Sequence, residues 1–103
     1  MARAGGEAAS LTLGADGAAR LEGALGFATV AALLPAGERA ILAGEAAVID
    51  LAGVTSTDSA GLALLVEWLS IARAASRPLS YRHVPAALRH LARLSEVEPL
   101  LDP

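Results

Sequence analysis

The sequence predicts an α/β fold, a mixed and mostly parallel β-sheet packed by α-helices. Two observations support this prediction. Short apolar segments with strand character alternate with longer segments in which apolar residues recur at helical spacing. Their order is strand, strand, helix, strand, helix, strand, helix, and such alternation joins parallel strands through helical crossovers. With 103 residues, the chain is expected to form a single domain over residues 1–103.

The N-terminal half predicts a hairpin followed by an interrupted helix. Residues 9–13 and 18–21 are short, partly alternating segments around the sequence GADG, which suits a tight turn. Residues 27–42 then keep apolar side chains at helical spacing. The sequence PAG at 35–37 should break or kink this helix, because proline donates no main-chain hydrogen bond.

The C-terminal half predicts two strands and two helices. The sequence AAVIDL at 46–51 is typical of a strand buried on both faces. Residues 59–75 form the most strongly helical segment, and RPLSYRHV at 77–84 supplies another short strand. The sequence PAALRHLARL at 85–94 begins with proline at a plausible first helical position.

Composition excludes several classes of function. The chain has no cysteine and all eight of its basic residues are arginine, so thiol catalysis, cysteine-ligated zinc and a catalytic lysine are excluded. A net charge of -3 without a basic stripe argues against nucleic-acid binding. The glycines form no phosphate-binding loop, and His83 and His90 lack further metal ligands, so neither a cofactor nor a metal is expected.

The same sequence argues against direct membrane insertion. The longest uncharged stretch lies between Glu22 and Glu38 and is broken by glycine and proline, whereas a spanning helix needs roughly 20 apolar residues. The first ten residues do not resemble a signal peptide. The protein is therefore expected in the cytoplasm, with any membrane attachment supplied by a partner.

Polar residues gather where the buried strand passes into the strongest helix, in the sequence AGVTSTDSAG. Asp58 or Ser59 is expected to cap this helix, because either side chain can accept a hydrogen bond from the free amides of the first turn. The helix dipole and these amides would also stabilise a phosphate attached there. Capping alone is one interpretation of this junction, and a functional site is the other.

The helix behind this junction has two apolar faces. The first should pack on the sheet and contains Leu62, Leu65, Val66, Leu69 and Ala72. The second is displaced around the helix and contains Leu64, Trp68, Ile71 and Ala75. A neighbouring helix, such as the C-terminal one, would cover this second stripe; otherwise it is an exposed protein-contact patch beside Ser59.

The sequence VIDLAGVTSTDSAGLALL resembles the signature of STAS domains, the fold of bacterial anti-sigma factor antagonists. The residues from Asp58 to Leu62 match that pattern position by position, and Ser59 lies where the antagonists carry their phosphorylated serine. Within the family, the flanking sequences LEGALGFATVAALL and GLALLVEWLSIARA resemble the small STAS subunit of the Mla phospholipid transporter, an inner-membrane ABC system that maintains outer-membrane lipid asymmetry.

This resemblance implies a non-catalytic subunit that binds the transporter's ATPase, and through it the permease, at the cytoplasmic side of the inner membrane. Ser59 would lie at the centre of the contact, where Mla-type relatives typically carry threonine. We expect polar contacts from Thr57, Asp58 and Ser59, with Ala60 beside them. The buried apolar part of the contact is expected from Leu64, Trp68 and Ile71.

Two other functions remain open from the sequence. An anti-sigma factor antagonist would bind its kinase when Ser59 is free and release it once Ser59 is phosphorylated, because the added charge opposes docking. A small hydrolase would use Ser59 as nucleophile and would require a histidine close to it. The sequence shows no nucleophile elbow around Ser59.

Overall fold

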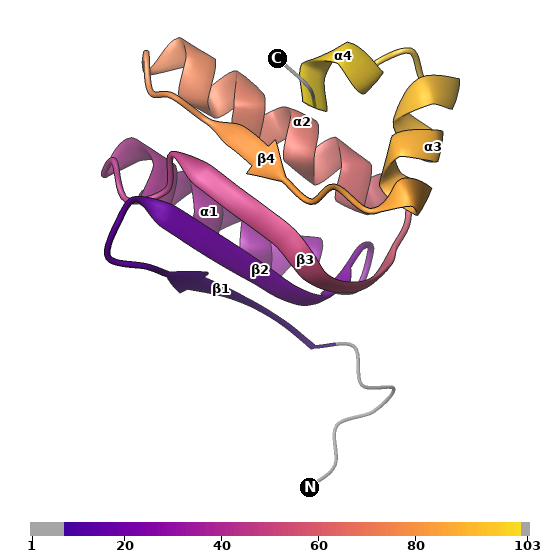
Figure 1. The fold of residues 1–103 in the computed structure, drawn as a ribbon, viewed down its shortest axis with the longest axis horizontal. Coiled ribbons are helices and arrows are strands. Elements are labelled where there is room, and N and C mark those ends of the chain that lie inside the picture. The colour runs from indigo at the N-terminus through magenta and orange to yellow at the C-terminus, as the bar shows by residue number, and fades with distance from the viewer. Residues whose placement is uncertain (1–7, 102–103) are drawn as a thin grey trace, which may run out of the picture.

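The computed structural model describes residues 8–101 and confirms the α/β fold (Figure 1). Its four strands are β1 (Ala9–Leu13), β2 (Ala18–Leu25), β3 (Val48–Thr57) and β4 (Ser80–Arg82). They lie in the order β1-β2-β3-β4; β1 and β2 are antiparallel, and the other two pairs are parallel. The predicted hairpin is confirmed, with Gly17 in the left-handed region of its turn.

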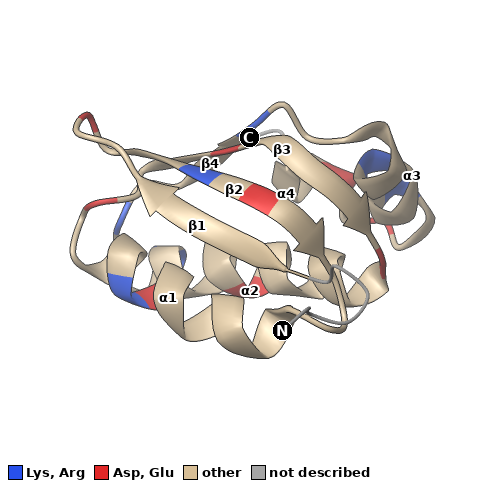
Figure 2. Ribbon diagram, turned by 90° about the horizontal axis from the view of Figure 1, so that it is seen from below, with Lys and Arg blue, Asp and Glu red and all other residues tan. Residues whose placement is uncertain are grey.

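Four helices complete the fold: α1 (Val30–Leu42), α2 (Ser59–Ala74), α3 (Ala86–Leu94) and α4 (Glu98–Leu101). Figure 2 shows α1 and α2 lying together against one face of the sheet. The core lies between this face and the helices, and α3 and α4 contact α2. The largest fully buried side chains are Trp68, Leu21, Leu25, Ile41, Ile49, Leu51, Leu65, Leu88 and Leu101.

Several predicted boundaries were wrong. The helix expected from residue 27 begins at Val30 and continues through Pro35 without a break, since proline removes only one hydrogen bond of its ladder. The strand expected at 46–51 extends to Thr57. His83 follows β4 instead of lying within it, and Pro85 is the N-cap of α3. The short helix α4 was not predicted.

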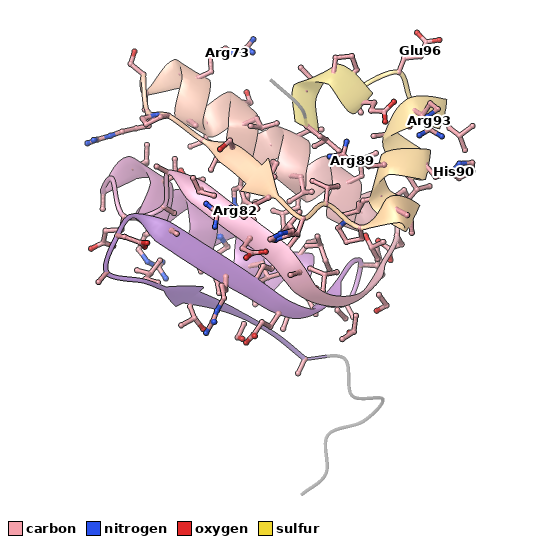
Figure 3. All side chains as sticks on the ribbon, viewed as in Figure 1. Arg73, Arg82, Arg89, His90, Arg93 and Glu96 are labelled. Atoms are coloured by element: carbon pink, nitrogen blue, oxygen red, sulfur yellow. The ribbon has the colours of Figure 1, made fainter. Side chains whose placement is uncertain are left out.

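The other face of the sheet is polar. Arg20, Asp50 and Arg82 are neighbours across β2, β3 and β4, and Figure 3 shows Arg82 on the face turned toward the viewer. The β2–β3 register shifts between Arg20 and Glu22, and the amide of Ala52 at this irregularity donates to the Asp50 carboxylate at 2.9 Å. One face of the sheet is thus reserved for the core, while the other is solvated.

Candidate functional site

Asp58 joins the end of β3 to two other segments. Its Oδ1 accepts hydrogen bonds from the amides of Ala60 at 2.9 Å and Gly61 at 3.1 Å, so of the two predicted caps, Asp58 and Ser59, Asp58 is the N-cap of α2. Its Oδ2 accepts from the amide of Phe27 at 3.0 Å. The Phe27 amide, followed by those of Gly61 and Ala60, holds the pKa of Asp58 below its ordinary value. The charged carboxylate therefore fixes the loop before α1 against the start of α2.

The rest of the motif is also explained by packing. A side chain at Gly61 would overlap the main-chain oxygen of Leu25, so only glycine allows α2 to start this close to the end of β2. Leu62 follows it into the core. In the loop before α1, the buried Thr29 hydroxyl donates to the carbonyl of Ala24 at 2.8 Å. Both segments flanking the site are therefore held in place by internal contacts.

Ser59 is the first residue of α2 and is exposed. Within the described residues, its hydroxyl makes no hydrogen bond. Thr57 is half-buried and its hydroxyl lies 3.5 Å from the carbonyl of Asp58, at the limit of a hydrogen bond. The structure therefore places Thr57, Asp58, Ser59 and the half-buried Ala60 together, with the Ser59 hydroxyl available for an outside partner.

The expected exposure of the second stripe on α2 is wrong. Leu64 is 4% exposed and Trp68 is fully buried, while Ile71 is half-buried and packs on the core. The cover is α1 and not the C-terminal helix: the Trp68 indole lies against Gly37 and donates from Nε1 to the Leu34 carbonyl at 3.2 Å. Trp68 is thus a core residue and cannot anchor a partner in this conformation.

An exposed apolar surface does lie beside Ser59, but other residues form it. A groove of about 450 Å³ runs between the first halves of α1 and α2. We name it the α1–α2 groove and define it by its lining: Phe27, Val30, Ala31, Leu34, Ala60, Ala63, Leu64 and Glu67. Glu67 is its only charged residue. Of the predicted site residues, Ala60 and Leu64 contribute to it.

Phe27 was not among the predicted site residues. It is the chain's only phenylalanine, and it is 83% exposed although large apolar side chains are usually buried. It also lines a second hollow of about 200 Å³ that includes Ser56, Thr57 and Asp58. Phe27 therefore stands between the polar turn and the α1–α2 groove. Its place directly after Gly26 was the one available signal in the sequence, since a glycine can mark the end of a loop before a helix.

The histidines and the carboxylates of the described residues lie as follows relative to the candidate site. His83 Nδ1 lies 2.9 Å from Asp50 Oδ1 on the polar face of the sheet, and His90 lies on α3 (Figure 3); among the described residues, neither histidine makes a hydrogen bond to Ser59. Across residues 8–101, no three potential metal ligands cluster. Nor does any helix in this range combine the length and apolarity needed to cross a bilayer.

Comparisons with known proteins agree with the fold. A family model described as "Mlab, STAS domain" matches residues 10–102. A solved structure of the anti-sigma factor antagonist SpoIIAA in its unphosphorylated form superposes with a TM-score of 0.64, covering 84% of this chain and 83% of that one. The identity between the two sequences is 16%, so this likeness shows a common fold. No curated protein matches the chain.

Proposed function

The chain belongs to the STAS-domain family, in its MlaB-type branch, and on that premise we propose that it is a non-catalytic subunit that binds the cytoplasmic ATPase of a phospholipid-transporting Mla complex. In this role it supports assembly of the ATPase and its hydrolysis of ATP. The complex would hold the protein at the inner membrane, where transport maintains outer-membrane lipid asymmetry. The observation that carries this proposal is the α1–α2 groove beside the exposed Ser59.

The contact would combine two kinds of surface. The polar part is the turn formed by Thr57, Asp58 and Ser59, with the free Ser59 hydroxyl near its centre. The apolar part is the α1–α2 groove, with Phe27 projecting at its edge. An exposed aromatic side chain beside an apolar hollow is the usual composition of a protein-binding centre. Asp58 caps α2 and Trp68 bonds it to α1, so internal contacts position both sides of this surface without a partner.

Co-expression with the ATPase of the same organism's Mla-type transporter tests this function. We expect a complex that survives size-exclusion chromatography, and an ATP turnover by the ATPase that falls when this subunit is left out. Capture of the permease together with the ATPase from native membranes would place the complex in the transporter. An ATPase that neither binds this chain nor changes its turnover in its presence would refute the proposal.

The alternative candidate function is that of an anti-sigma factor antagonist, whose partner is a serine kinase. The exposed hydroxyl of Ser59 at the N-terminus of α2 favours it, because a kinase needs access to that oxygen and the helix amides would stabilise the phosphate. Incubation with the serine kinases of the same organism separates the two functions. Stoichiometric phosphate on Ser59 supports the second, whereas stable capture of the ATPase without phosphate supports the first.

A further inference from the structure

The outer edge of β1 is unoccupied by any strand of the described chain, since β1 pairs with β2 alone (Figure 1). The amide of Gly14 donates to Ala18, and the carbonyl of Ala8 accepts from Ala24. In an antiparallel pair such bonds fall on every second residue, so the even-numbered residues of β1 face β2. Ala9, Leu11 and Leu13 therefore direct their amides and carbonyls outward.

This edge lacks the features that usually prevent strand pairing. Its sequence is ASLTL, without charge or proline, and its register with β2 is continuous from Ala9 to Leu13. Proteins commonly protect an edge with lysine, proline or a bulge. Leu13 is 45% exposed on the core side of the sheet, where it adds apolar surface to the free hydrogen-bonding groups. The edge is therefore a template for another strand.

We propose that two copies of this chain associate through β1, forming one sheet across a two-fold axis at Leu11. An antiparallel pair of identical strands is self-complementary, so each strand offers the other the same outward groups. In this register Leu11 lies opposite Leu11 of the second copy. Ala9 then lies opposite Leu13 of the second copy, and Leu13 lies opposite Ala9. Each of the three pairs exchanges two main-chain hydrogen bonds.

The side chains in this register match on both faces of the sheet. On the core side, Leu13 packs against Ala9 of the second copy, which covers its exposed surface. On the polar side, Arg20 and Thr12 of one copy share a row with Ser10 and Glu22 of the second, as the β1–β2 register fixes. Arg20 and Glu22 of that row are three strand spacings apart, about 14 Å between Cα atoms, within reach of two long side chains. Charge thus favours a second copy over an unrelated strand.

This association is separate from the proposed function, because no residue of β1 lines the α1–α2 groove. Sedimentation equilibrium of the full chain tests it over a concentration series. We expect the wild-type mass to rise from one chain toward two. Leu13→Lys and Leu13→Pro should stay at one chain, since lysine blocks an edge and proline removes an outward amide without touching the β1–β2 bonds. Leu94→Lys, on α3, should behave as wild type. A wild-type mass that stays at one chain, or a Leu13→Lys mass equal to wild type, would overturn the proposal.

Hydrogen exchange locates the contact independently of any variant. The amides of Ala9, Leu11 and Leu13 should exchange several-fold more slowly at high than at low protein concentration, whereas exposed amides on α3 should not change. A dimer in which these three amides exchange equally at both concentrations pairs elsewhere and refutes the assignment to β1.

A charge exchange tests the register. Arg20→Glu should weaken the dimer, because it places two negative side chains, at positions 20 and 22, in the same row of the joined sheet. Adding Glu22→Arg should restore the dimer, because each row then again contains one positive and one negative side chain.

Discussion

The indole ring of Trp68 occupies the space that a side chain at Gly37 would need, and this contact joins α2 to α1. A Cβ on Gly37 would overlap the Cε2 and Cζ2 atoms of the ring. The ring also donates from Nε1 to the carbonyl of Leu34. The two helices that line the proposed docking groove are therefore fixed relative to each other by one buried aromatic residue and one glycine.

Substituting Gly37→Ala should destabilise the protein by about 1–3 kcal/mol, because the added methyl forces the buried ring to move. Helix propensity alone favours alanine over glycine by about 1 kcal/mol, so the sign of the change is diagnostic. Urea unfolding measures it. The exposed Ser70→Ala on α2 is the control, with an expected change within about 0.5 kcal/mol. A Gly37→Ala variant more stable than wild type would contradict the packing described here.

Trp68→Ala should cost about 3–5 kcal/mol of folding stability, as expected for removal of a fully buried aromatic side chain. Any loss of partner binding in this variant would follow from the loss of structure. Thermal unfolding followed by circular dichroism provides the measurement. If Trp68→Ala kept wild-type stability and lost only partner binding, Trp68 would be an interface residue after all.

Asp58 should make stability depend on acid pH. Its folded pKa lies below the ordinary value of 3.8, so the folded protein binds fewer protons than the unfolded chain between the two values. Its contribution is complete above 3.8 and is lost as the pH falls through the folded pKa. Urea midpoints from about pH 6 to pH 2.5 should show wild type more stable than Asp58→Asn at the upper end, with the difference shrinking toward the lower end. A constant difference would contradict the role of the charged carboxylate.

Ser59 should tolerate loss of its hydroxyl but not gain of charge. Ser59→Ala keeps the turn, because Asp58 makes the capping bonds, and we expect its affinity for the ATPase to fall by less than about fivefold. Ser59→Glu places a charge in a contact that excludes water and should abolish binding. Isothermal titration calorimetry of the ATPase with each variant measures these two affinities. Equal affinities would remove Ser59 from the centre of the interface.

Local patterns in the sequence were sufficient for the fold and for the turn. The alternation of elements and the turn of GADG depend on residues close together in the chain, and the structure confirms both. The sequence left Asp58 and Ser59 as alternative caps of α2, and the structure shows that Asp58 is the cap. The extension of β3 to Thr57 was missed because AGVTST contains glycine and polar residues, and its strand conformation comes from pairing with β2. Pairing of this kind is a long-range contact that no local pattern reports.

The apolar half of the site could not be predicted for a similar reason. Helical spacing correctly separated the two apolar faces of α2, but it does not say which neighbour covers the second. Here Gly37 allows α1 to approach Trp68, so Trp68 and Leu64 of the stripe expected to be exposed are buried, while Ile71 is half-buried and Ala75 is exposed. Phe27 was assigned to the expected helix, yet the helix begins three residues later and leaves Phe27 exposed in the loop.

The affinity of Phe27→Ala for the ATPase decides whether the α1–α2 groove is the docking site. Phe27 is 83% exposed, and its amide, which bonds Asp58, is retained in the variant, so folding stability should stay within about 0.5 kcal/mol of wild type. Leu94→Ala is the matched control, since Leu94 is 69% exposed on α3, outside the α1–α2 groove. We predict that Phe27→Ala raises the Kd by about 30-fold or more, while Leu94→Ala leaves it within about twofold. A folded Phe27→Ala variant that binds the ATPase as tightly as wild type would contradict the proposed docking site.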